Sequence, residues 1–250
     1  MELKERALGS MFGLAIGDAL GAPNEFRPPG ELHITTMVGG HRLYPELQPG
    51  QWTDDTSMAL CLAESLVECK GHDSKNQLEK YNQWYKEGYM SSDPPECIGI
   101  GSTTKASIDT FRKRGDLESP FSDEQFSGNG SIMRLAPVPI YFRDDLEECV
   151  NNAVLSSIPT HSSTLCQHSC AYFATLIWEA LNGTSKEEFL APYAGQEFFE
   201  KNLDPKVKEV AEGSFKDLEG DIPNSGFVVD SLVAALYAFH TTDSFKDGAI

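Results

Sequence analysis

The sequence has few basic residues for its length. Its 250 residues include 20 Lys and Arg against 38 Asp and Glu, which gives a formal net charge of -18. A protein that binds nucleic acid along its phosphate backbone needs clustered positive charge, so this balance argues against direct nucleic-acid binding. It still permits a local phosphate site that uses backbone N–H groups or a bound cation.

Paired cysteines and long apolar runs are also lacking. No apolar run reaches the ~20 residues that a membrane-spanning helix needs. The segment from Met11 to Ala22 is interrupted by Asp18 and follows mixed charges, which argues against a secretory signal. We therefore expect a cytoplasmic protein without membrane contact, whose six scattered cysteines are reduced: Cys61, Cys69, Cys97, Cys149, Cys166 and Cys170.

What the sequence does have is helical periodicity. Apolar residues recur every three or four positions in several segments, which predicts amphipathic helices. A stretch rich in Gly and Pro at 27–50 predicts a long irregular loop, which in a compact domain is often functional. The predicted helices cover 3–21, 54–69, 76–89, 102–112, 132–140, 146–157, 164–181 and 225–242, with a further one beginning after Ser244.

Two adjacent carboxylates stand at the start of the predicted helix at 54–69. Thr53 precedes Asp54 and Asp55, and apolar residues at helical spacing follow. Acidic residues suit the free N–H groups and the positive dipole end of a helix. They are also hard oxygen ligands for Mg²⁺ or Ca²⁺. The spacing alone leaves both interpretations open.

Two further carboxylates lie near the end of the first predicted helix. Asp18 falls on its apolar face, and a buried carboxylate needs hydrogen bonds, a partner or a metal. Asp18 either accepts hydrogen bonds from the N–H groups of the turn at Gly21 or binds the ligands of a site and fixes their orientation. Glu25 follows in a loop beside Phe26 and is either solvated or functional.

Glycine-rich turns and one histidine complete the set of candidates. Gly99 and Gly101 precede the helix at 102–112, and a glycine turn at 128–130 precedes Ser131 and Met133. Such turns bring backbone N–H groups close to a ligand, although each motif alone often marks only a turn. His161 and Ser162 lie just before the helix at 164–181, where a ligand anion or a purely structural role would both fit.

Taken in order, these motifs resemble one known family. They are Gly13–Gly21, Glu25-Phe26, Trp52–Thr56, Gly128–Arg134, Thr160–Ser162 and Ser225–Asp230. Together they resemble the ADP-ribosylglycohydrolase family, which includes the dinitrogenase reductase-activating glycohydrolase. The resemblance extends over essentially all 250 residues, and six ordered motifs are far more specific than any one of them.

The resemblance implies an all-α fold, a compact orthogonal helical bundle formed by one domain over residues 1–250. It also implies a cleft with two Mg²⁺ ions, and a hydrolase that removes ADP-ribose from modified protein side chains or from small ADP-ribosyl compounds. Thr53, Asp54 and Asp55 match the first metal-ligand triplet of the family, and Asp55 or Glu25 would position the attacking water.

The same resemblance assigns substrate contacts. The segment from Asn129 to Met133, which includes Gly130 and Ser131, matches the part of the family that holds the diphosphate and riboses. His161 and Ser162 match another such part. Gly99 and Gly101 are further candidates, and Asp18 would support the metal ligands.

One departure bears on activity. The family carries a second metal-ligand run, Gly-Asp-x-Asp-Thr, shortly after the segment that matches Phe245–Ile250, and the 250 residues end before it. We expect a C-terminally incomplete chain, a split protein with a complementing C-terminal fragment, or a pseudoenzyme. Two functions therefore remain: a Mg²⁺-dependent ADP-ribosyl hydrolase, and a non-catalytic binder of ADP-ribose.

Overall fold

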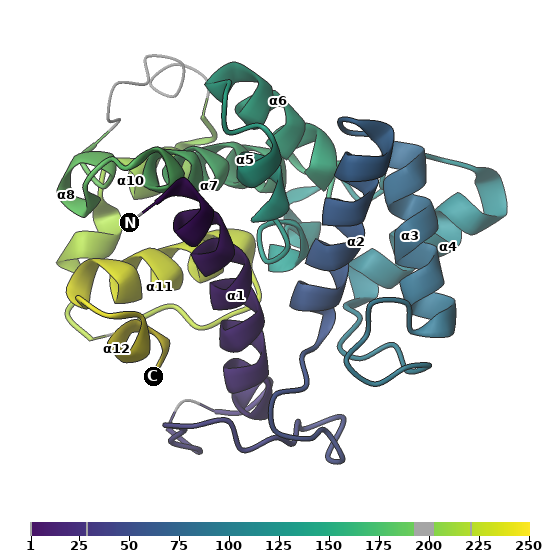
Figure 1. Cartoon of the computed structure of the whole chain (residues 1–250), viewed down its shortest axis with the longest axis horizontal. Helices are drawn as coiled ribbons and strands as arrows, with labels where there is room; N and C mark the ends of the chain where they lie inside the picture. The colour runs from purple at the N-terminus through teal and green to yellow at the C-terminus, as the bar shows by residue number, and fades with distance from the viewer. Residues whose placement is uncertain (1, 29, 193–202, 221) are drawn as a thin grey trace.

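The computed structural model describes residues 2–28, 30–192, 203–220 and 222–250. These residues form helices and connecting segments, and they contain no β-strand. The only strand-like pairing found among them is an isolated antiparallel bridge between Gly128 and Phe227. The predicted all-α fold is confirmed (Figure 1).

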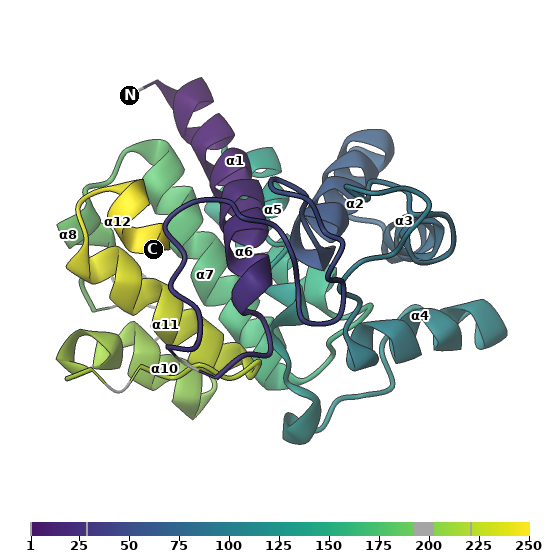
Figure 2. The same ribbon diagram turned by 90° about the horizontal axis from the view of Figure 1, so that it is seen from below.

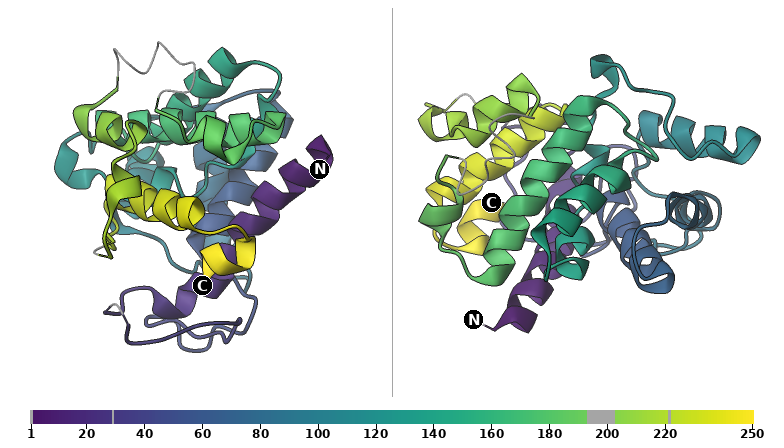
Figure 3. Two further views of the ribbon diagram at one scale, coloured as in Figure 1. Left: turned by 90° about the vertical axis from the view of Figure 1, so that its left-hand side faces the viewer. Right: turned by 90° about the horizontal axis from the view of Figure 1, so that it is seen from above.

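The helix α7 (Thr164–Asn182) is the central element of one half of the molecule. It packs against α1 (Leu3–Gly21), α5 (Pro137–Tyr141), α6 (Leu146–Ser157), α10 (Pro205–Ala211) and α11 (Val228–Thr241). The further views show α7 and α6 side by side, with α1 crossing the bundle near them (Figure 3). Two short helices, α8 (Lys186–Phe189) and α12 (Phe245–Ala249), lie against α7 and α11 respectively.

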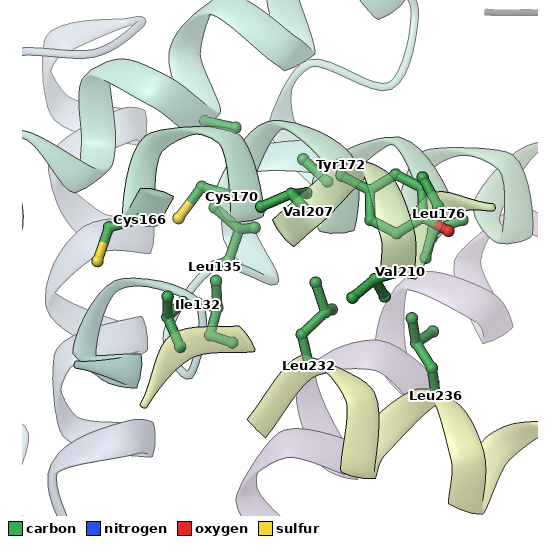
Figure 4. Packing of buried hydrophobic residues seen from close by; sticks show 14 of the residues in the cluster. Ile132, Leu135, Cys166, Cys170, Tyr172, Leu176, Val207, Val210, Leu232 and Leu236 are labelled. Atoms are coloured by element: carbon green, nitrogen blue, oxygen red, sulfur yellow. The ribbon is translucent and has the colours of Figure 1, made fainter. Parts of the chain in front are cut away.

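Burial of apolar side chains between these helices explains why they pack. Tyr172 and Leu176 of α7 face Val207 and Val210 of α10, and Leu232 from α11 joins them (Figure 4). All five side chains are buried in one hydrophobic cluster. Burying one such side chain contributes about 1.5–3 kcal/mol, so this cluster is a main source of stability for the bundle.

A second hydrophobic cluster joins three helices on the opposite side. The helices α2 (Asp54–Cys69), α3 (Ser74–Glu87) and α4 (Ser102–Arg114) pack in sequence order, α2 on α3 and α3 on α4. Their core contains the fully buried residues Met58, Cys61, Leu78, Tyr81, Trp84 and Ile108. The starts of α2 and α4 are thereby fixed, and both contribute to the site described below.

The segment between α1 and α2 is the long irregular loop that the Gly and Pro content predicts. It crosses in front of α1 in the view from below (Figure 2). A short helical turn at Ala22–Asn24 is its only helical part among the described residues.

The predicted helix at 132–140 is wrong in its bounds. The structure has a 3₁₀ turn at Asn129–Ser131 and a helix, α5, that begins at Pro137. Proline lacks an N–H group, and the first turn of a helix leaves its N–H groups without partners in any case, so Pro137 starts the helix.

Candidate functional site

A cleft of about 810 Å³ lies where the irregular loop meets the starts of α2 and α4. Its wall comes from 24–28, Asp54 and Asp55, 99–104, the turn at 128–130, and 224–226. Segments far apart in the sequence therefore meet at one cavity. Of the sequence-predicted residues, the wall contains Glu25, Asp54, Asp55, Gly99, Gly101, Asn129, Gly130, Met133 and His161.

Asp18 lies behind the acidic pair and fixes the start of α2. Its carboxylate accepts hydrogen bonds from the backbone N–H groups of Thr53 and Thr56, at 3.0 Å each to the nearer oxygen. It also accepts from both threonine hydroxyls, at 2.7 Å. The alternative in which Asp18 bonds the Gly21 turn is wrong, because its side chain serves the first turn of α2 instead. A side-chain acceptor is what the free N–H groups at a helix start require.

Four carboxylates therefore crowd together at the start of α2. Burial, followed by the charges of Glu25 and Asp18, raises the pKa of Asp54 well above its ordinary value. Burial, followed by Asp18, Asp54 and Glu25, raises the pKa of Asp55 in the same direction. Like charges disfavour ionisation of their neighbours, so this arrangement is electrostatically unfavourable without a positive partner.

Gly99 brings the chain close against Asp54. Its φ is +87°, in the left-handed region, and a Cβ at this position would come within 2.4 Å of Asp54 Oδ1. Only glycine fits there without displacing the carboxylate. Gly101 differs, because its φ is -70° and a Cβ would meet open space.

The glycine turn at 128–130 is joined to the start of α11. The N–H of Asn129 donates to the carbonyl of Gly226 at 2.9 Å, and its side-chain amide donates to Ser231 Oγ at 3.0 Å. The structure has a 3₁₀ turn at Asn129–Ser131. Gly130 packs on His161, since a Cβ on Gly130 would lie 2.5 Å from the imidazole Cε1.

Arg134 holds this turn from inside the protein. It is 1% exposed, and its guanidinium donates to the carbonyls of Gly130 and Ser156 and to Thr160 Oγ1, at 2.9, 3.0 and 2.7 Å. The guanidinium also lies 4.8 Å from the ring centre of Tyr81. A buried cation needs such partners, and here they tie the glycine turn to the segment before α7.

Burial, together with the charge of the same arginine, keeps His161 neutral. Burial and the charge of Arg134 lower the pKa of His161 to about 3, so the imidazole is neutral. Its Nδ1 lies 2.9 Å from Thr160 Oγ1, and that hydroxyl accepts from Arg134. The hydroxyl hydrogen is then free to donate to Nδ1, which leaves the ring proton on Nε2. Because His161 lines the cleft, Nε2–H is a donor at its wall.

Three residues that were predicted to bind metal or substrate are not part of the wall that the described residues form. The hydroxyl of Ser162 donates to the carbonyl of Ser119 at 2.8 Å, away from the cleft. Ser131 is 1% exposed and lies in the protein interior. Thr53 is also buried, and its hydroxyl hydrogen is used by Asp18. In all three cases the local chain direction, which sequence spacing does not determine, turns the side chain away from the cleft.

Two residues that act on the site through other residues do not follow from the sequence. Thr160 belongs to the motif at Thr160–Ser162, but its spacing does not identify it as the hydrogen-bond partner of His161. The second is His41, whose Nε2 lies 2.7 Å from Glu25 Oε2. No signal in the sequence separates His41 from an ordinary loop histidine, because it is 16 residues from its partner in an irregular segment.

The acidic pair fits a cation. The ion pairs found among the described residues involve neither Asp54 nor Asp55, so their charge is not offset by a lysine or arginine. The described residues do not form a ready cluster of three or more His, Cys, Asp or Glu ligands. Mg²⁺ commonly keeps several waters and uses one or two carboxylates, so Asp54 and Asp55 suffice for one face of its shell.

Fold and site together define a class: an all-helical protein whose cleft combines paired carboxylates with glycine turns and a neutral histidine donor. The sequence matches the ADP-ribosylglycohydrolase family over residues 1–250. The chain therefore belongs to the ADP-ribosylglycohydrolase family, as the resemblance of its motifs predicted.

Several relatives are similar over almost the whole chain. It is 36% identical to the ADP-ribosylarginine hydrolase Tri1 of Serratia proteamaculans over 100% of this chain, and 37% identical to Tri1 of Pseudomonas putida over 98%. It spans 66% and 64% of the length of those two proteins. It is also 29% identical, over 97% of its length and 76% of the relative's, to the ADP-ribosyl-[dinitrogen reductase] glycohydrolase of Rhodospirillum rubrum.

A solved structure shares the fold. An ADP-ribosylglycohydrolase-related protein complex superposes with a TM-score of 0.80 at 35% identity, covering 99% of this chain and 80% of that chain. This agreement supports the helical arrangement on which the cleft depends. None of the helices that the structure describes has the length and apolar character needed to cross a membrane.

Proposed function

We propose that the cleft hydrolyses the glycosidic bond between ADP-ribose and a modified protein side chain, with Mg²⁺ bound at Asp54 and Asp55. One observation carries the proposal: Glu25, Asp54 and Asp55 meet glycine turns and His161 in a single cavity. The names of the Tri1 relatives support arginine as the side chain that carries ADP-ribose.

The chemistry requires water to add at the anomeric carbon. The bond from that carbon to the side-chain nitrogen breaks, the water oxygen takes its place, and a proton is transferred to the leaving nitrogen. The transition state has oxocarbenium character, so nearby carboxylates stabilise it. When bound, Mg²⁺ supplies positive charge that keeps the aspartates ionised and orients ribose hydroxyls and water. Asp55 or Glu25 accepts the proton of the attacking water.

Other parts of the cleft wall supply donors for the rest of the ligand. His161 presents Nε2–H, and the segment 99–104 leads into the first turn of α4, where backbone N–H groups lack helical partners. Phosphate and hydroxyl oxygens accept hydrogen bonds from such groups. We therefore place the diphosphate and riboses of ADP-ribose along this wall, with the scissile bond at the carboxylates.

The test is release of free ADP-ribose from a protein carrying ADP-ribosylarginine, with Mg²⁺ and with a chelator. We expect metal-dependent release that Asp55→Asn lowers by about 100-fold or more, the scale of a lost catalytic carboxylate. Asp144→Asn is the matched control, because it removes the same charge from an exposed side chain that lies outside the cleft wall.

The possible outcomes separate the two functions. Release that needs Mg²⁺ and Asp55 supports the hydrolase. ADP-ribose binding without release, in calorimetry, would instead support the non-catalytic binder. A chain that neither binds nor releases ADP-ribose would refute both proposals. A parallel substrate modified on serine measures the preference for arginine.

A further inference from the structure

His41 belongs to the irregular loop between α1 and α2, and its side chain contacts Glu25. The imidazole is fully buried, and its Nε2 is 2.7 Å from Glu25 Oε2, while the glutamate side chain remains 38% exposed. The contact therefore joins a buried loop residue to a residue of the cleft wall.

The backbone of the loop fixes which ring nitrogen carries the proton. The N–H of Leu43 donates to His41 Nδ1 at 3.0 Å, so Nδ1 is an acceptor without a proton. In the neutral ring the proton is then on Nε2, and Nε2–H donates to Glu25 Oε2. A hydrogen bond to a carboxylate is stronger than one between neutral groups.

The loop that presents His41 is anchored to the protein core. The N–H of Gly40 donates to the carbonyl of Leu47 at 2.6 Å, which closes the segment on either side of His41. Leu47 is buried with Ala22 and Ile98, and Tyr44 packs on this small cluster. The ring of Tyr44 also lies 5.2 Å from the ring of His41. His41 is thus held in place independently of Glu25.

The backbone at Glu25 is fixed from the other side. Phe26 has a φ of 59°, which is rare for a residue with a side chain, and its carbonyl accepts from Arg42. Arg27 Nε donates to the carbonyl of Pro23 at 2.8 Å. With the backbone held and Oε2 bound by His41, Oε1 of Glu25 receives no hydrogen bond from the described residues.

We propose that His41 is a positioning residue that binds one oxygen of Glu25 and directs the other, Oε1, toward a water or hydroxyl in the cleft. This inference rests on the hydrolase function proposed above and assigns to Glu25 a fixed geometry within it. His41 touches neither the ligand nor the reacting atoms. It acts by limiting the rotation of the carboxylate, since a carboxylate with one bound oxygen presents the other in a defined direction.

Two substitutions separate the two hydrogen bonds of His41. Asn at this position places its amide near Nδ1, where it accepts from Leu43 but does not reach Glu25. Gln places its amide near Nε2, where it donates to Glu25. We expect His41→Asn to lower kcat for ADP-ribose release about tenfold or more, with KM changed less than about threefold, and His41→Gln to retain most of the rate.

The Glu25→Ala variant tests whether His41 affects kcat through Glu25. If His41 acts only through Glu25, its substitution causes no further loss of kcat once Glu25 is removed. Adding His41→Asn to Glu25→Ala should therefore leave kcat unchanged. An additive loss, equal effects of Asn and Gln, or a wild-type rate in Glu25→Ala would each overturn the proposal.

A second measurement does not depend on turnover. Nitrogen-resolved NMR of the full chain should show His41 with an unprotonated Nδ1 and a slowly exchanging Nε2–H, and Glu25→Ala should speed that exchange. Protonated Nδ1, or exchange indifferent to Glu25, would overturn the proposal. If the wild-type chain releases no ADP-ribose, the proposed function fails while this NMR result still decides the contact.

Discussion

Adding one methyl group at Gly99 is expected to displace Asp54 and destabilise the protein. Gly99 has a φ of +87°, and a Cβ there would stand 2.4 Å from Asp54 Oδ1 and 3.0 Å from Thr53 Cβ. The left-handed conformation costs a residue with a Cβ about 1–2 kcal/mol. Overpacking adds about 1–3 kcal/mol. The lower entropy of the unfolded chain offsets about 0.4–1 kcal/mol.

The expected net effect of Gly99→Ala is therefore a loss of about 3 kcal/mol in the free energy of unfolding. Gly101→Ala is the matched control two residues away. Its φ of -70° suits alanine, and nothing lies within 4 Å of the added Cβ. The loss of a glycine N-cap of α4 and the stabilisation from the lower entropy of the unfolded chain nearly cancel there, which leaves a change within about 1 kcal/mol.

Urea-induced unfolding followed by circular dichroism measures both variants. Both variants replace glycine by alanine. The difference between their free energies of unfolding therefore reports the left-handed backbone at Gly99 and its close contact with Asp54. Calorimetric titration with Mg²⁺ then reports whether Asp54 still serves the proposed ion, and we expect weaker binding in Gly99→Ala alone. If the two variants unfold at free energies within about 0.5 kcal/mol of each other, the close approach of Gly99 to Asp54 is refuted.

Three further perturbations test the interior of the site. The pKa of His161 falls from 6.5 to about 3 on folding, so only the unfolded chain takes up this proton between those values. Stability should then fall by about 1.4 kcal/mol per pH unit as pH drops below 6.5, and urea unfolding of His161→Asn should show a shallower dependence. Arg134→Met should cost about 3–5 kcal/mol by leaving its buried acceptors unpaired, whereas loss below about 1 kcal/mol would contradict its role. Asp18→Ala should cost about 2 kcal/mol in thermal unfolding by freeing the first turn of α2, and an unchanged melting temperature would contradict that role.

Helices with caps and regular apolar spacing could be predicted from the sequence. The predicted bounds of α6, Leu146–Ser157, agree with the structure, where Asp145 accepts from the N–H of Glu148 as the N-cap. At the start of α7, the side chain of Ser163 accepts from the N–H of Cys166 as the N-cap. These features depend on neighbours within four residues, and local sequence determines them.

Contacts between distant segments could not be predicted in the same way. His41 and Glu25 meet through a loop with no periodicity, and the Thr160 hydroxyl that contacts His161 also accepts from Arg134, which comes from another segment. Ser162 adjoins His161 in sequence, yet it faces Ser119 while His161 lines the cleft. The direction of a side chain in an irregular segment is set by tertiary packing, which has no short-range sequence pattern.

The position of Asp18 gives a physical argument for a cation that is independent of family resemblance. Helical spacing correctly placed this residue on the inner face of α1, and its carboxylate binds the first turn of α2. That helix itself begins with Asp54 and Asp55, and Glu25 adds a fourth negative group. The dipole of a helix start offers only about half a positive charge. Four carboxylates around one helix start carry more negative charge than this dipole can offset, which supports the divalent cation that we propose at Asp54 and Asp55 on the cleft side.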